Sequence, residues 1–326
     1  MTEQGGGQGG HGGGSTAIVA ALGANLGIAV AKLVAFFVTG ASSMLAEGIH
    51  SVADSGNQVL LLVGGRRARR EATPHHPFGF GRDRYVYGFL VAIVLFSVGG
   101  VFAVYEGVHK IASPEALDSP VWAFAVLIVA IGLEGFSLRT AVKETNAVRR
   151  PGVSYWAFIR TARAPELPVV LLEDTAALLG LVLALLGVGL TTLTGNPVFD
   201  GLGTVAIGLL LVVVAGILGV ETKSLLLGEA ATPEAQRRIV AALEGGASGL
   251  SVIHMRTQHL GPEELLVAAK IAVEHDETAA SIARAIDDAE ARIRAAEPIA
   301  RVIYLEPDLR RPGTGPVEGP AAVLRG

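Results

Sequence analysis

An imidazole and a carboxylate stand four residues apart within an apolar stretch that favours a helix. His50 and Asp54 belong to the segment AEGIHSVADSGNQ at 46–58. On an α-helix this spacing puts both side chains on one face, one turn apart. Ionisable groups are costly inside a membrane and usually face an ion site or a pathway there. We therefore interpret the pair as half of a cation site.

Two adjacent carboxylates form the expected second half of this site. Glu173 and Asp174 lie in the apolar segment PVVLLEDTAALLGLVLALLG. Neighbouring helical residues diverge by about 100°, so the two acids cannot both point squarely at one ion. A stripe of small residues typical of close helix packing shares the face of Glu173: Ala177, Gly180, Ala184 and Gly187. Periodicity does not choose between the two acids.

The ligand types limit the chemistry of the site. The chain has no cysteine, so disulfides and thiolate ligands are excluded. An imidazole with two carboxylates suits Zn²⁺, and Mn²⁺, Fe²⁺ or Co²⁺ are also compatible with such ligands. For the other polar residues of the apolar segments we expect buried hydrogen bonds or ion pairs, with Lys32 neutralising Glu47. These residues are Asn25, Lys32, Asn57, Gln58 and Glu134.

The composition of the chain is typical of a membrane protein. Hydrophobic residues make up 51% of the 326-residue chain, and charged residues only 17%. Six apolar segments are each long enough, at about 1.5 Å per residue, to cross about 30 Å of hydrocarbon. We place them at 16–39, 42–64, 86–109, 120–143, 166–192 and 201–220. The sequence thus predicts an α-helical membrane protein with six transmembrane helices, in a domain of residues 16–228.

Basic residues alternate between the connecting segments. The second and fourth connections carry nearly all of them: Arg66, Arg67, Arg69, Arg70, Arg82 and Arg84, then Lys143, Arg149, Arg150, Arg160 and Arg163. The positive-inside rule therefore puts both termini in the cytoplasm. The Ala- and Gly-rich composition favours a bacterium, and hence its inner (plasma) membrane. The aromatic and basic segment at 149–166 suits either an interfacial segment or a plain connector.

The region after the last apolar segment has a different pattern. A capped helical pattern at 232–246, two strand-like runs meeting at GPEE, a helical pattern at 277–296 and the run ARVIYLEP follow in order. They predict a cytoplasmic α+β domain at 229–309, ferredoxin-like, in the order α-β-β-α-β. We expect the Gly-rich residues 1–15 and the tail 310–326 to be disordered.

The chain resembles the cation diffusion facilitator family of metal/proton antiporters. The resemblance extends over nearly the whole chain. It rests on the motif from His50 to Asp54, the following HHPFGFGR at 75–82, the acids Glu173 and Asp174 of the fifth predicted helix, and the α+β tail. The LLEDTAA motif and the long fourth connection are similar to the zinc-transporter-nine-like branch. Family members place a His or Asp four residues before Asp174, where this chain has Val170. Glu173, a water molecule or a side chain of the first predicted helix at 16–39 could supply the fourth ligand of the metal.

The resemblance also implies secondary metal positions, which carry over only in part. His76 matches a loop ligand and His75 is its neighbour, whereas the second loop position is Phe80. In the tail, His254 matches a metal position of the first strand, but the second-strand position is Lys270. We therefore expect a dimerisation domain whose control by metal is weakened or absent.

The implied function is proton-coupled efflux of a divalent transition metal, with Zn²⁺ as the first expectation. The metal and protons would be its substrates, and we expect a homodimer in the lipid bilayer, with no enzyme activity, no cofactor and no nucleic-acid partner. Alternatives are an exporter of Mn²⁺, Fe²⁺ or Co²⁺, or a membrane-embedded regulator or scaffold with weak or lost transport. A carrier of an organic cation or a monovalent ion is a further alternative, which convergent carboxylates and an imidazole disfavour.

Overall fold

The fold comes from a computed structural model, which describes residues 12–117, 120–246 and 249–309, with side chains from Asn25 onward. The chain divides into two compact units. The first runs up to Gly64 and from Tyr87 to Glu221, and the second holds Gly65–Val86 and the chain from Thr222 onward. The tails predicted at 1–15 and 310–326 lie outside the described residues, except for 12–15, which belong to the first helix.

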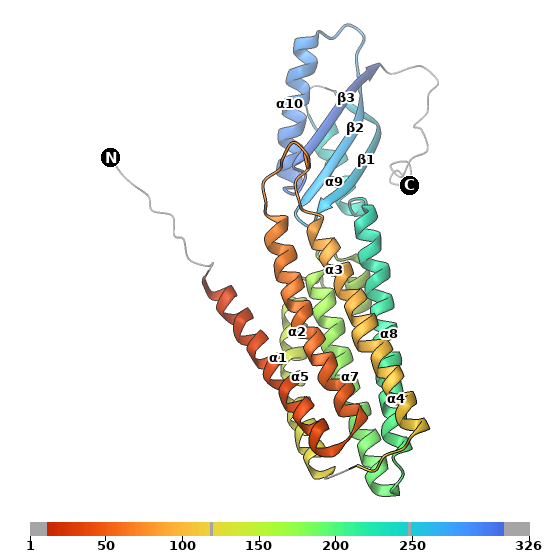
Figure 1. The fold of residues 1–326 in the computed structure, drawn as a ribbon. Coiled ribbons are helices and arrows are strands. Elements are labelled where there is room, and N and C mark those ends of the chain that lie inside the picture. The colour runs from red at the N-terminus through yellow and green to blue at the C-terminus, as the bar shows by residue number, and fades with distance from the viewer. Residues whose placement is uncertain (1–11, 118–119, 247–248, 310–326) are drawn as a thin grey trace, which may run out of the picture. The chain divides into compact units, whose positions relative to one another are not determined.

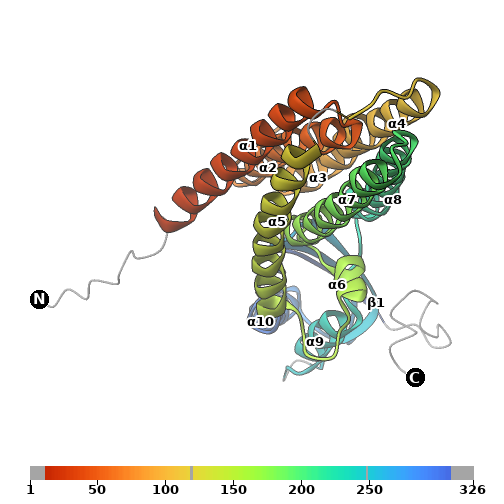
Figure 2. The same cartoon turned by 90° about the horizontal axis from the view of Figure 1, so that it is seen from below.

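Long helices make up the first unit, and the ends of three of them belong to the second (Figure 1). They are α1 (Gly12–Thr39), α2 (Ser42–Ala68), the continuous run of α3 (Asp83–Val94), the π-helix η1 (Leu95–Val101) and α4 (Phe102–Ala112), then α5 (Pro120–Val148), α7 (Glu166–Thr194) and α8 (Val198–Leu227). The three whose ends belong to the second unit are α2, α3 and α8. α5 packs between α1 and α7, as Figure 2 shows from below. These helices coincide with the six predicted segments and extend past them, because hydropathy marks only the apolar part of a helix whose hydrogen bonding continues into its polar ends.

Within the described residues, four helical segments are long and apolar enough to cross a membrane: Asp83–Ala112, Pro120–Val148, Glu166–Thr194 and Val198–Leu227. The described part of α1 adds the shorter apolar stretch Asn25–Thr39. α2 carries the polar residues of the candidate site, which lower its hydropathy. The chain is thus a helical membrane protein, and the count of six spans stays a prediction.

A buried carboxylate fixes the start of α2. Asp200, at the beginning of α8, accepts hydrogen bonds from the backbone N–H of Ser42 at 2.7 Å and of Ser43 at 3.4 Å. Both serine hydroxyls donate to it as well. A carboxylate is favourable at a helix N-terminus, where unpaired N–H groups and the helix dipole meet. This cap positions the helix that carries His50.

Glycines let the third helical run approach α8 closely. A Cβ on Gly100 would lie 2.8 Å from Val212 Cγ2, and one on Gly107 would lie 2.6 Å from Val205 N. A Cβ on Gly208 of α8 would likewise lie 2.6 Å from Val104 N. The π-helix Leu95–Val101 lies in this run and was not predicted, because a single wide turn does not change the apolar pattern.

The fourth connection contains the short helix α6 (Tyr155–Thr161), whose first turn is capped by Ser154. The guanidinium of Arg149 lies 4.5 Å from the ring centroid of Tyr155. Trp156 is exposed and Ile159 is buried. The segment is therefore an ordered helical turn with an aromatic side chain left outside, and the choice between interfacial segment and connector stays open.

The second unit carries the predicted α-β-β-α-β order (Figure 1). Its elements are α9 (Pro233–Glu244), β1 (Ser251–Gly261), β2 (Glu264–Val273), α10 (Ala279–Ala296) and β3 (Val302–Leu309). β1 and β2 pair antiparallel across a tight turn, and α10 provides the crossover that lets β3 pair parallel to β2. A buried apolar core joins the helices to the sheet: Ile239, Leu243, Leu265, Val267, Ile271 and Ile293.

Candidate metal centre

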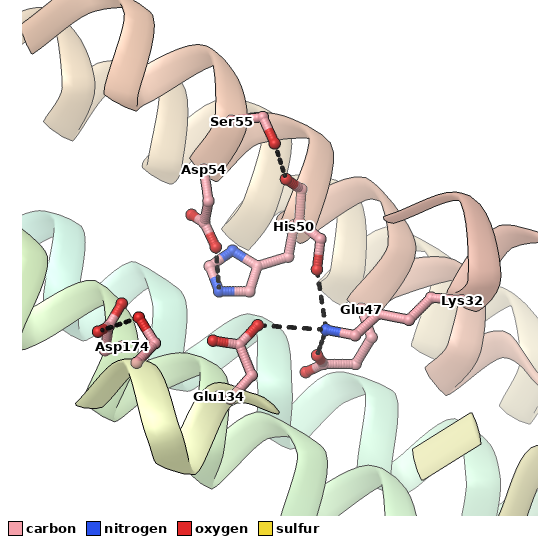
Figure 3. A network of polar contacts seen from close by, with 9 residues as sticks. Lys32, Glu47, His50, Asp54, Ser55, Glu134 and Asp174 are labelled. Carbon is pink, nitrogen blue, oxygen red and sulfur yellow. Dashed lines mark hydrogen bonds and ion pairs between the residues drawn. The ribbon is translucent and has the colours of Figure 1, made fainter. Parts of the chain in front are cut away.

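The predicted pair on α2 is present, with His50 buried and Asp54 partly buried. His50 Nε2 lies 3.4 Å from Asp54 Oδ2, with 1% and 14% of the two side chains exposed. Their spacing of one helical turn puts both on the face that Figure 3 shows turned toward α5 and α7. Among the described residues, neither ring nitrogen of His50 has a hydrogen-bond partner, although Nε2 lies within ion-pair distance of Asp54. An imidazole nitrogen that is buried without a partner is a typical position for binding a cation or a proton.

The two acids of α7 diverge, as their adjacency requires. Glu173 Oε1 accepts a hydrogen bond from Asn57 Nδ2 of α2 at 2.7 Å. Asp174 Oδ2 accepts one from Ser137 Oγ of α5 at 2.8 Å. Glu173 therefore faces α2 and Asp174 faces α5, so both lie at seams between helices. Neither acid faces lipid alone, which is consistent with the cost of an isolated charge there.

A small cavity lies between these acids and α2. Its volume is about 10 Å³, which is about the space that the centre of a single water molecule or ion needs. The side chains that line it come from four helices: Asn25, Ser51, Asp54, Gln58, Glu134, Val170, Glu173 and Asp174. Four of these residues have carboxyl side chains, and none of the eight is basic. Val170 stands in its wall at the position where the resemblance led us to look for a fourth ligand.

The candidate ligands do not converge on a single point. In the described part of the chain, no three His, Asp or Glu side chains lie close enough together to hold a metal ion. Each acid has its own partner instead: His50 for Asp54, Asn57 for Glu173 and Ser137 for Asp174. Coordination of one ion would therefore require rotation of these side chains or movement of their helices.

A buried lysine forms a second polar cluster beside the pair. Lys32 Nζ lies 3.0 Å from Glu47 Oε2 and 4.0 Å from Glu134 Oε1, and it donates to Ser51 Oγ at 2.8 Å (Figure 3). The expected pairing of Lys32 with Glu47 is thus present. Glu134 lies within ion-pair distance of Lys32, as its expected structural role requires, and it also lines the cavity beside Asp54. Its position in the middle of an apolar helix was a signal for a site role.

The secondary histidines are not brought together. His75 and His76 are exposed, and the ring of His76 lies 4.6 Å from that of Phe80, the residue at the second loop position. His254 stands directly opposite Lys270 in the β1–β2 ladder. Within the described residues, neither the loop nor the sheet holds a group of three potential metal ligands.

A lysine ion-pair cluster occupies the sheet position where the resemblance would put a ligand. Lys270 Nζ lies 3.1 Å from Glu306 Oε1 and 3.2 Å from Asp308 Oδ2. Hydrogen bonds to Glu306 and then Asp308 raise the pKa of Lys270 above its usual value. A fixed ammonium at this point repels a metal cation, which supports the expectation of weakened metal control in this domain.

The fold and the cavity together define a class of protein: a helical membrane protein with a carboxylate-lined cavity between its helices. Residues 18–227 match the cation efflux transmembrane domain. The chain belongs to the cation diffusion facilitator family, in its zinc-transporter-nine-like branch.

Three relatives illustrate the range of this similarity. The mitochondrial proton-coupled zinc antiporter SLC30A9 of Homo sapiens is 35% identical over 231 residues, which cover 71% of this chain and 41% of that protein. Metal tolerance protein C4 of Arabidopsis thaliana is 27% identical over 78% of this chain and 56% of its own length. The cation-efflux pump FieF of Pectobacterium atrosepticum is 25% identical over 88% of this chain and 90% of its own. The chain thus spans about two fifths of the SLC30A9 length.

Proposed function

We propose that this protein exports a divalent transition metal, Zn²⁺ first, from the cytoplasm in exchange for protons. The observation that carries the proposal is the cavity lined by Asp54, Glu134, Glu173 and Asp174, with His50 paired to Asp54 at its edge. Four carboxylates around a space for one ion favour a multivalent cation over an organic one. The zinc antiporter named among the relatives supports Zn²⁺, and the ligand types also admit Mn²⁺, Fe²⁺ or Co²⁺.

The proposed ligands are His50, Asp54 and Asp174, with Glu173 as the fourth in place of the residue at Val170. A metal binds the deprotonated forms of these groups, so protons compete with it for the same atoms. Asn57 and Ser137 hold Glu173 and Asp174 on opposite seams, and the helices would have to shift for both acids to reach one ion. Such a shift is the kind of motion that alternating access needs.

The arrangement in the cell is part of the same proposal. The basic second and fourth connections favour a cytoplasmic location for both termini, in a bacterial inner membrane. The α+β domain would join two copies as a homodimer, with no nucleic acid and no resident cofactor involved. Truncation after Leu227 should then abolish the dimer, and an unchanged mass of the truncated protein would count against this role.

Transport in proteoliposomes with a pH gradient tests the function. We expect uptake of Zn²⁺ that depends on the gradient and falls to background for Asp54→Asn and Asp174→Asn. Glu144→Gln, an exposed carboxylate on α5, is the matched control and should transport normally. Failure of every tested metal to move, or normal transport by both aspartate variants, would refute the proposal. Comparison of Zn²⁺ with Mn²⁺, Fe²⁺ and Co²⁺ ranks the substrates.

A regulator or scaffold of the same fold is the second candidate function. Two observations favour it: Val170 stands at the fourth ligand position, and the described acidic groups do not converge. This reading predicts a folded, dimeric protein that moves no metal in the same assay. It further predicts that Glu173→Gln leaves metal binding unaltered, whereas the transporter reading predicts weaker binding.

A further inference from the structure

A cavity separate from the metal centre lies within the second unit. Its volume is about 440 Å³, and it forms between the connection that follows α2 and the turn between β1 and β2. Its charged lining consists of Arg69, Arg70, Arg84, Glu263, Glu264 and Arg301. This size falls in the range of pockets that hold small molecules or large headgroups.

The lining has an excess of positive charge. Arg84 Nη1 pairs with Glu263 Oε1 at 3.3 Å. Across the described residues, no carboxylate lies within ion-pair distance of Arg69, Arg70 or Arg301. Four arginines and two glutamates give the lining a net charge of +2, and three of its arginines have no carboxylate partner among the described residues. Such a cavity favours an anion that carries several acceptor oxygens.

The backbone around the cavity is tightly built. Gly81 and Gly261 pack against each other: a Cβ on Gly81 would lie 2.9 Å from Leu260 O, and one on Gly261 would lie 2.9 Å from Gly81 Cα. Thr73 and His76 exchange backbone hydrogen bonds of 3.2 and 2.9 Å in the same connection. The loop is thus held on the hairpin turn, and the cavity wall is a fixed surface.

Phosphate matches this lining better than other common anions. Arginine guanidinium groups bind phosphate oxygens with paired, charge-assisted hydrogen bonds. The chain itself indicates the source of the phosphate. Arg69 and Arg70 come directly after Ala68, the last residue of α2, so they follow a membrane helix without a spacer. Clusters of basic residues directly after the cytoplasmic end of a membrane helix are typical binding sites for anionic lipid headgroups.

We propose that this cavity binds the phosphate headgroup of an anionic phospholipid. Arg69, Arg70 and Arg301 would contact the phosphate oxygens, while the Arg84–Glu263 pair keeps the hairpin turn in place. Bound lipid would then link the loop after α2 to the α+β domain, so that the anionic lipid content of the membrane stabilises the second unit. This role does not depend on which metal is transported.

Native mass spectrometry of the full chain in detergent tests the proposal with dioleoylphosphatidylglycerol and dioleoylphosphatidylcholine. We expect preferential retention of phosphatidylglycerol, reduced at least about tenfold in Arg69→Gln/Arg70→Gln, because charge-assisted hydrogen bonds are lost. Arg66→Gln/Arg67→Gln removes the same charge from the same segment outside the cavity and should retain the lipid. Equal loss in both double variants would overturn the proposal in favour of general surface attraction.

A second pair of variants keeps every arginine. Gly81→Ala pushes the loop from the hairpin and should abolish phosphatidylglycerol retention. Gly216→Ala on α8 is the control and should retain the lipid, because Gly216 lies outside the cavity lining and its added methyl group meets nothing within 4 Å. Thermal unfolding of each variant checks that the protein is folded. Binding of inorganic phosphate that depends on Arg69 and Arg70, with no preference between the two lipids, would assign the cavity to a soluble phosphate and overturn the lipid proposal.

Discussion

Lys32 Nζ lies 3.0 Å from Glu47 Oε2, and both side chains are completely buried between α1 and α2. The lysine also donates to Ser51, one residue after His50. A cation is thus already fixed within one helical turn of the candidate metal ligands. Its charge offsets part of the carboxylate charge around the cavity, which lets several acids share a membrane interior without a bound metal.

Removal of this cation should destabilise the bundle strongly. Lys32→Met leaves Glu47 buried without its partner, and loss of one member of a buried pair costs about 3–5 kcal/mol. Thermal unfolding of the full chain in detergent measures the loss. The double variant Lys32→Met/Glu47→Gln removes both charges and should recover much of the stability. If the double variant is no more stable than the single one, the ion pair is not what holds α1 on α2.

The order of elements was predictable because it depends on local patterns. Long apolar segments separated by basic connections indicated the helices. The succession of helical and strand-like patterns from Thr232 to Pro307 indicated the order of the α+β domain. The π-helix at Leu95–Val101 was not predictable, since it changes the hydrogen-bond pattern without changing the apolar periodicity. The grouping of the Arg-rich loop 65–86 with the α+β domain depends on contacts between distant residues, which no local pattern encodes.

The residue types of the candidate site were predictable from the sequence, and their spatial arrangement was predictable only in part. The four-residue spacing correctly put His50 and Asp54 on one face, and adjacency correctly required Glu173 and Asp174 to diverge. The ion pair expected for Glu134 is present with Lys32, but a single carboxylate in a sequence does not reveal that it also lines a cavity. Only the packing of α5 between α1 and α7 puts it in the wall of the cavity.

The cap on α2 should be required for stability. Asp200→Ala removes the acceptor of two backbone N–H groups and two hydroxyls of Ser42 and Ser43, at a cost of about 2–4 kcal/mol. The lost cap loosens the start of the helix that carries His50, so metal affinity should fall together with the unfolding temperature. Asp200→Asn keeps one oxygen acceptor and should lose less. Equal losses in both variants would mean that the negative charge, rather than the cap, is what matters.

Gly180 of α7 should be required for the position of Glu47. An added Cβ would collide with Glu47 Oε1, so Gly180→Ala should displace this carboxylate from Lys32. We expect lower stability and weaker metal binding, measured by thermal unfolding and by titration calorimetry of the full chain. Gly189→Ala on the same helix meets only Phe124 Cε1 at 4.0 Å and is the matched control. Identical behaviour of the two variants would exclude close packing at Gly180.

Replacement of Lys270 by histidine should create a metal response in the α+β domain. Lys270 stands opposite His254 on β1 and opposite Glu306 on β3, so the three side chains form a row across one face of the sheet. Two imidazoles and a carboxylate are a usual set of zinc ligands. Zn²⁺ should raise the unfolding temperature of the Lys270→His variant of the full chain, because a ligand that binds only the folded state stabilises it. Subtracting the effect of Zn²⁺ on the unmodified chain removes the contribution of the membrane site. In the double variant His254→Ala/Lys270→His the extra stabilisation should disappear, and its persistence would show that the row is not the binding site.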